Sequence, residues 1–148
     1  MLLNSEFIIP NSKLKRTFMS EIPIKESIVA GKAYAFALDI VKLYKHLSTD
    51  KKEYVLSKQI LRSGTSIGAN LNEAVSSESK RDFVHKLSIG LKEAKETAYW
   101  LRLLKDSEYI SLQHYTPIDN KCSELIRMLS SIILTTKQRY FGKTSSEL

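Results

Sequence analysis

The chain has 148 residues, of which 43% are hydrophobic and 26% are charged, and this is the ordinary composition of one globular domain. The 23 Lys and Arg residues against 16 Asp and Glu residues give a net charge of +7, which favours an anionic partner without identifying one. The single cysteine, Cys122, cannot form an internal disulfide, and no apolar run approaches the ~20 residues of a membrane span. We therefore expect a cytoplasmic protein without membrane contact.

Residues 1–22 are expected to form a flexible leader in front of the folded domain. Their basic cluster of Lys13, Lys15 and Arg16 has no sustained apolar periodicity around it. The segment is therefore interpreted as a mobile tail or as a basic arm, and a third interpretation takes Met19 as the natural start. The folded domain is expected to span residues 23–141, and residues 142–148 are expected to form a flexible tail.

The first two expected helices are separated by a short polar break. Apolar residues at helical spacing predict the first helix from about Lys25 to Leu47. Asp50, with Glu53 three residues later, resembles a capping box that opens a second helix ending near Ser76. At 1.5 Å per residue this second helix would be roughly 40 Å long.

The third and fourth helices have their own start signals. Ser79 with Asp82 repeats the capping pattern and opens a third helix, again roughly 40 Å long. The fourth is predicted to begin with Thr116 as N-cap and Pro117 at the first helical position, and to stop before Gly142. Short connections make neighbouring helices antiparallel, so we predict an all-α, antiparallel up-down four-helix bundle. The third helix has a heptad seam formed by Phe83, Leu87, Gly90, Ala94, Thr97, Leu101 and Leu104.

Two glycines interrupt the second expected helix without interrupting its apolar periodicity. Gly64 and Gly68 each cost ~1 kcal/mol relative to alanine in a helix, which indicates that the bare backbone is needed for close contact with a facing helix, expected at Gly90 and Ala94. The same stretch has the G-x-S-x-G pattern of a hydrolase nucleophile elbow around Ser66. That elbow requires a strand-to-helix turn, and no strand precedes it here. The packing interpretation is therefore favoured.

Other catalytic or metal-binding patterns are incomplete. A dinuclear metal site in a bundle needs a Glu-x-x-His motif from each of two helices, and of the three histidines only His85, three residues after Asp82, has related spacing. Cys122 lies on the apolar seam of the fourth helix and is expected to be a buried, inert thiol. We therefore assign no catalytic residue, metal or cofactor, and expect a protein that is not an enzyme.

A basic stripe is the strongest candidate for a binding surface. Lys92, Lys95, Tyr99 and Arg102 recur at steps of three, four and three, so they share one face of the third helix. The stripe is either a solvated surface with local ion pairs, such as Lys92 with Glu96, or a phosphate-facing surface for RNA or DNA. The cations that could extend it are Lys58, Arg62, Lys137, Arg139 and Lys143.

Trp100 lies on the flank of the third helix's seam. It is expected either to broaden the core or to contact another subunit, where tryptophan is over-represented.

The order of several short motifs resembles the four-helix-bundle family named after the protein encoded in 23S rRNA intervening sequences. The resemblance covers about Ala33 to Lys137, and the leader and Pro117 depart from it. The matching pieces are Leu61-Arg62-Ser63, Thr65-Ser66-Ile67-Gly68-Ala69-Asn70, Glu73-Ala74, Ser79, Asp82-Phe83, Glu93, Glu96-Thr97, Tyr99-Trp100-Leu101, Glu124-Leu125, Met128-Leu129 and Ser131-Ile132-Ile133.

This resemblance implies a bundle that self-associates into a ring, typically a pentamer, without catalytic activity. It also implies a relation to the accessory variability protein of diversity-generating retroelements, a similar bundle that binds reverse transcriptase and nucleic acid. The implied partners are thus further copies of the chain, RNA or DNA, and a reverse transcriptase or other ribonucleoprotein component. The alternative is a structural protein–protein interaction module whose positive charge only aids solubility.

Overall fold

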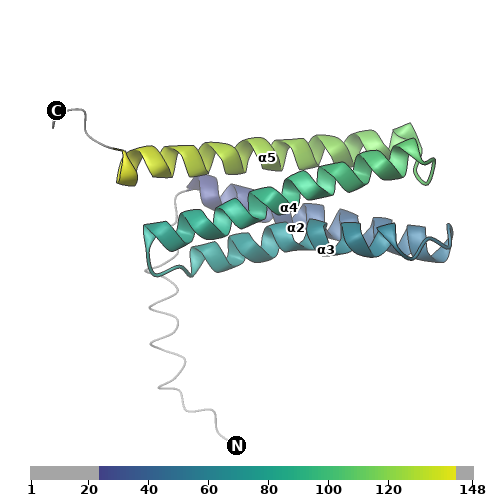
Figure 1. Cartoon of the computed structure of the whole chain (residues 1–148), viewed down its shortest axis with the longest axis horizontal. Helices are drawn as coiled ribbons and strands as arrows, with labels where there is room; N and C mark the ends of the chain where they lie inside the picture. The colour runs from purple at the N-terminus through teal and green to yellow at the C-terminus, as the bar shows by residue number, and fades with distance from the viewer. Residues whose placement is uncertain (1–23, 143–148) are drawn as a thin grey trace, which may run out of the picture.

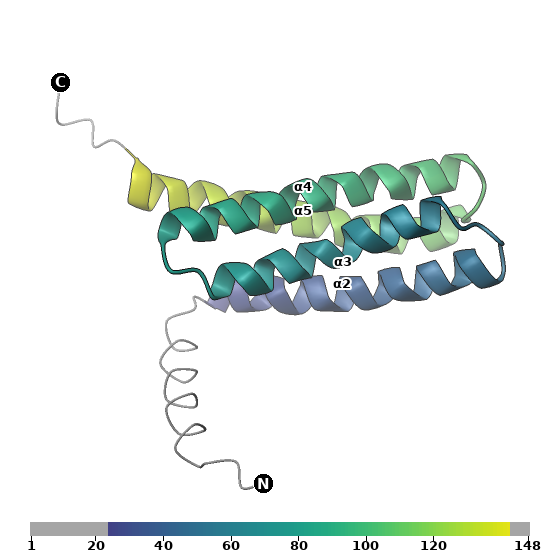
Figure 2. The ribbon, with the colours of Figure 1, turned by 60° about the horizontal axis from the view of Figure 1, so that its bottom comes forward.

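The computed structural model describes residues 24–142, with side chains described from Ile28 onwards. Within this range the chain forms an all-α, up-down bundle in which consecutive helices run antiparallel, as Figures 1 and 2 show. The predicted fold class is confirmed. The expected leader (1–22), the tail beyond Gly142 and the candidate cation Lys143 lie outside the described residues. The helices are α2 (Ile24–Thr49), α3 (Leu56–Val75), α4 (Lys80–Asp106) and α5 (Leu112–Phe141).

Each helix packs against two neighbours. The contacting pairs among the described residues are α2 with α3, α3 with α4, α4 with α5, and α2 with α5. Helices α2 and α4 therefore occupy diagonal corners of the bundle. Two surface ion pairs, Lys32–Glu124 at 2.9 Å and Asp39–Lys121 at 2.5 Å, join α2 to α5 and fit their antiparallel direction.

The core consists of the residues that recur at steps of three and four along each helix. Burial of one Leu, Ile or Phe side chain contributes about 1.5–3 kcal/mol, so this continuous apolar seam is the main source of stability. No helix in residues 24–142 is long and apolar enough to cross a membrane. Fully or almost fully buried side chains come from all four helices: Ala33, Phe36, Ile40, Leu47, Ile60, Ile67, Leu71, Leu87, Ala94, Leu101, Leu104, Cys122, Leu125, Leu129 and Ile132.

The predicted start of α3 is wrong: the helix begins at Leu56 and not directly after Asp50. The Asp50 carboxylate does not cap α3; it lies 2.8 Å from the ring Nδ1 of His46, at the end of α2. Lys52 has a φ of 54°, a left-handed conformation that interrupts a helix. As a result α3 has 20 residues and is about 30 Å long rather than 40 Å.

Glu53 stabilises the start of α3 from the loop in front of it. Its carboxylate accepts the backbone N–H groups of Val55 at 3.0 Å, Leu56 at 2.8 Å and Ser57 at 2.6 Å. The side chain is buried, and burial by itself would raise the pKa of this carboxyl. The N–H donors outweigh that effect and lower the pKa of Glu53 below its ordinary value.

The predicted start of α4 is confirmed, whereas the predicted start of α5 is wrong. Ser79 Oγ accepts the Asp82 N–H at 3.0 Å, as the capping pattern indicated. Helix α5 begins directly after Ser111, whose hydroxyl accepts the His114 N–H, and not at Thr116. Pro117 lies inside the helix, in its second turn, where it removes one backbone hydrogen bond close to the helix start.

Candidate nucleic-acid and protein interfaces

The basic stripe lies on the outer face of α4. Lys92, Lys95 and Arg102 are exposed, and the Tyr99 side chain between them is 50% exposed. Within residues 28–142 none of the three cations forms an ion pair. The stripe is therefore a surface with positive charge that no described carboxylate neutralises by direct contact.

The expected ion pair between Lys92 and Glu96 does not form. Glu96 Oε1 instead accepts hydrogen bonds from Arg62 Nη2 at 2.6 Å and from Trp100 Nε1 at 3.2 Å. Arg62 Nη1 also lies 3.6 Å from Glu93 Oε1. The hydrogen bond to Glu96 and the charges of the two carboxylates raise the pKa of Arg62. Arg62, a candidate for phosphate binding, is thus engaged in joining α3 to α4.

Beneath this ion-pair cluster lies a buried polar contact. The hydroxyl oxygens of Ser63 and Thr97 are 2.9 Å apart, and both side chains are completely buried. Glu93 Oε2 is also buried and has no hydrogen-bond partner among the described residues. The sequence offered one signal for this contact: Ser63 and Thr97 are polar residues among apolar ones on the inner sides of their helices, and buried hydroxyl groups usually pair. Their pairing fixes the register of α3 against α4.

The remaining cations are divided between the two ends of α4. Lys58 is exposed one helical turn before Arg62 on the antiparallel α3, so it lies level with the carboxyl-terminal half of α4. Lys137 and Arg139 are exposed near the carboxyl end of α5, next to the amino end of α4. Arg102 is 22 residues beyond the first residue of α4, or about 33 Å along the helix. Lys58 therefore lies on a neighbouring helix at the level of Arg102, whereas Lys137 and Arg139 lie at the opposite end of α4.

Trp100 belongs to the core of its own chain. Its ring is half-buried against the core, and Tyr99 packs edge-on against it with 5.0 Å between ring centroids. This position fits a broader core, the first of the two expected roles, and contact with another subunit stays a prediction.

The glycines of α3 face α2, and this corrects the expected pairing with Gly90 and Ala94. A Cβ atom at Gly64 would lie 2.8 Å from Ile40 Cγ1, closer than real Cβ contacts, so only glycine fits against this buried isoleucine. A Cβ at Gly68 would meet Ala33 of α2 at an ordinary 3.7 Å.

Gly90 forms the close contact between α4 and α3. A Cβ there would lie 3.3 Å from Leu71 Cδ1 and 3.5 Å from the carbonyl oxygen of Ile67. The sequence indicated that glycines mark close helix contacts, but not which neighbouring helix each glycine meets.

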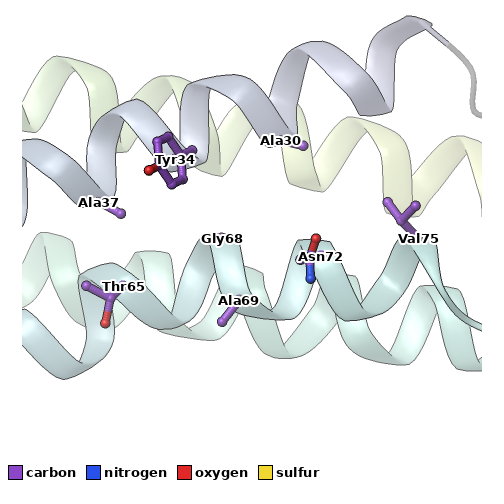
Figure 3. Close-up of a pocket in the computed structure, with 8 residues that line it drawn as sticks. All are labelled: Ala30, Tyr34, Ala37, Thr65, Gly68, Ala69, Asn72 and Val75. Atoms are coloured by element: carbon purple, nitrogen blue, oxygen red, sulfur yellow. The ribbon is translucent and has the colours of Figure 1, made fainter. Parts of the chain in front are cut away.

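A shallow groove of about 500 Å³ separates the outer edges of α2 and α3 (Figure 3). On the adjoining surface of α2, Tyr34 is 68% exposed, Ile28 49% and Leu38 48%. A helix that is apolar on its outer as well as its inner side is typical of one covered on both sides. The groove is lined by Ala30, Tyr34, Ala37, Thr65, Gly68, Ala69, Asn72 and Val75.

Neither the candidate serine nor the cysteine has the surroundings of a nucleophile. Ser66 lies in the middle of α3, and its hydroxyl donates to the Arg62 carbonyl at 2.6 Å. Cys122 is buried with Sγ 3.3 Å from the Ala94 carbonyl oxygen, and burial, together with the charge of Asp119, raises the pKa of the thiol to about 12. Within the part of the chain that the structure describes, no group of three or more His, Cys, Asp or Glu residues could hold a metal ion.

The fold defines an all-α, up-down four-helix bundle, and comparison with known proteins gives its family. Residues 25–131 match the family described as 23S rRNA-intervening sequence protein, and the chain belongs to that family. The structural resemblance predicted from the motifs is thereby confirmed.

A solved structure from Bacteroides thetaiotaomicron is similar to this chain. It is described as a protein with unknown function from the S23 ribosomal protein family and has 53% sequence identity and a TM-score of 0.73. The match covers 74% of this chain and 98% of that one. Comparison with curated proteins gave no match. Neither the family's description nor that of the solved structure suggests catalysis.

Proposed function

We propose that this protein is a non-enzymatic, self-associating bundle that binds RNA or DNA through the outer face of α4. The observation that carries the proposal is the unpaired stripe of Lys92, Lys95 and Arg102, with the exposed Tyr99 among them. A solvated face stabilised by local ion pairs would have paired Lys92 with Glu96, four residues later, but Glu96 pairs with Arg62 of α3.

Such a stripe binds the phosphate backbone rather than reading base edges. Cations spaced along one helix neutralise successive phosphates and release counterions, so binding is weakly sequence-selective and falls steeply with salt. The family's description refers to 23S rRNA intervening sequences, which makes structured RNA the first ligand to test.

Self-association is the second part of the proposal. Tyr34 and Leu38 on α2, together with the groove against α3, supply the exposed apolar surface that a subunit contact would cover. A closed ring, for which the resemblance implies five copies, would repeat the α4 stripe around one assembly and strengthen phosphate binding through multivalency. The single unpaired cysteine fits a reducing, cytoplasmic setting.

The alternative function is a protein-interaction module without nucleic-acid binding. The same apolar groove favours it, because a helix of another protein would fit there as well as a second copy would. A reverse transcriptase or another ribonucleoprotein component is the partner class that the resemblance implies.

The decisive experiment compares two charge-reversal variants in titrations of labelled structured RNA at about 0.05 M salt. The triple variant Lys92→Glu, Lys95→Glu, Arg102→Glu should lose affinity by about ten-fold or more while the assembly keeps its mass. A control triple, Lys51→Glu, Lys52→Glu, Arg127→Glu, changes the net charge equally at exposed sites away from α4 and from the outer face of α2.

Each result of this comparison separates the proposals. Selective loss in the α4 variant supports the stripe as the phosphate-binding surface. Equal losses in both variants indicate that net charge alone attracts RNA, and absence of binding by the unaltered protein favours the interaction module.

A further inference from the structure

A second surface lies where the carboxyl end of α5 meets the amino end of α4, as Figure 2 shows. The last turn of α5 exposes two adjacent aromatic side chains, Tyr140 at 49% and Phe141 at 46%. The two half-exposed rings together give this end of the bundle an apolar area that a ligand can cover.

Two lysines lie on the same surface as these rings. Lys80 Nζ lies 5.0 Å from the centroid of the Tyr140 ring and 5.8 Å from that of the Phe83 ring. Lys137 precedes Tyr140 by three residues and Phe141 by four, so it shares their side of α5. Neither lysine forms an ion pair with a carboxylate among residues 28–142.

We infer that this end cluster, defined as Lys80, Phe83, Lys137, Tyr140 and Phe141, binds single-stranded nucleic acid by stacking unpaired bases on its exposed rings. Aromatic rings that offer a stacking face, interleaved with cations that attract phosphates, are the arrangement used by proteins that hold single strands without reading their sequence. An apolar protein partner would have to cover the charges of Lys80 and Lys137, which favours a ligand that is both planar and anionic.

The inference rests on the proposed phosphate binding and adds a selectivity that the α4 stripe lacks. The stripe neutralises phosphates in either a duplex or a single strand. The end cluster responds only to bases whose faces are free, because the bases of a duplex are stacked on each other. The two surfaces are about 18 Å apart along α4, measured from Lys80 to Lys92 at 1.5 Å per residue.

The test uses the full-length protein and two labelled probes, an oligouridine of about 12 nucleotides and an RNA duplex of equal length. Tyr140→Ala and Phe141→Ala should each weaken oligouridine binding by about 5- to 100-fold and leave duplex binding nearly unchanged. Tyr140→Phe keeps the stacking ring and should bind as the parent does. Tyr54→Ala removes an exposed tyrosine at the opposite end of the bundle and serves as the matched control.

The possible results distinguish this inference from the proposed function. The end cluster is overturned if the alanine variants bind oligouridine like the parent, or if their affinities for the two probes fall equally. Neither result contradicts the α4 stripe. If the triple α4 variant retains its affinity for both probes while Tyr140→Ala loses affinity for oligouridine, the end cluster is supported and the α4 stripe is overturned. Failure of the parent protein to bind either probe at low salt overturns both. Circular dichroism of each variant serves as the check that the bundle remains folded.

Discussion

The outer faces of α2 and α4 lie at diagonal corners of the bundle and differ in chemistry. Their inner faces are alike, since both contribute a buried apolar seam. Outward, α2 exposes apolar side chains such as Tyr34 and Leu38, whereas α4 exposes Lys92, Lys95 and Arg102 without ion-pair partners among the described residues. The bundle thus specifies its fold with inward-facing residues and exposes two outward faces of different chemistry, for which we propose a protein partner at α2 and nucleic acid at α4.

The largest expected effect follows from altering the α2 face. The double variant Tyr34→Glu, Leu38→Glu places two charges on the proposed subunit contact and should reduce the assembly to the 16.9 kDa monomer, as measured by light scattering coupled to gel filtration. RNA affinity should then fall roughly ten-fold or more through lost multivalency.

A matched control keeps this prediction specific. Leu112→Glu with Leu134→Glu introduces the same charges at exposed leucines of α5 and should leave the mass unchanged. A monomeric parent protein at tens of micromolar, or a double α2 variant that still assembles, would rule out α2 as the subunit contact.

Substitutions at the contact between α2 and α3 should change the free energy of unfolding rather than the assembly. Gly64→Ala overlaps Ile40 and should destabilise the bundle by about 1–3 kcal/mol in chemical denaturation. Gly68→Ala, with ordinary space at 3.7 Å, and Gly31→Ala, with open space, should be neutral or gain up to about 1 kcal/mol of helix propensity. Equal stability of all three variants would contradict the assigned α2–α3 contact.

A smaller effect is expected at the start of α3, away from both outer faces. The folded state lowers the pKa of Glu53, so its carboxylate contributes stability that is fully present above the ordinary carboxyl pKa and is lost as pH falls through the lowered value. Glu53→Gln should reduce the free energy of unfolding at neutral pH by about 1 kcal/mol and flatten its decline in acid. An unchanged acid profile would show that Glu53 does not cap α3. RNA binding and assembly mass should stay the same.

The smallest effect distinguishes paired from unpaired cations on adjacent helices. Arg62→Gln removes a charge that two carboxylates already neutralise, so RNA affinity should change by less than about two-fold. Lys95→Gln removes an unpaired charge and should weaken binding several-fold at low salt. Comparable losses in the two variants would show that the ion pairs do not withdraw Arg62 from the binding surface.

The seams of all four helices could be predicted from the sequence because their spacing directly reflects burial on one side. Helix starts were harder to predict. The left-handed Lys52 and the carboxylate of Glu53 act from a loop, and local pattern rules place them inside a helix. Proline is common at the first position of a helix, which is why the sequence pattern placed the start of α5 there, but Pro117 lies in the second turn.

Predicting the candidate surfaces in full required knowledge of the contacts between helices. The stripe itself could be predicted from helical spacing. Whether its cations are paired, however, depends on whether Glu96 pairs with Lys92 on its own helix or with Arg62 on α3. Sequence spacing describes only the first possibility. Likewise, Gly64 signalled a close contact, but α3 has two neighbours and only the structure assigns the contact to Ile40.

The salt dependence of RNA binding tests the central proposal most directly. For the parent protein, the logarithm of the binding constant should fall linearly with the logarithm of salt concentration. Neutralising the stripe with Lys92→Gln, Lys95→Gln and Arg102→Gln should reduce the magnitude of that slope by about two or more, because three phosphate contacts are lost. An unchanged slope in the triple variant would contradict phosphate binding by the outer face of α4.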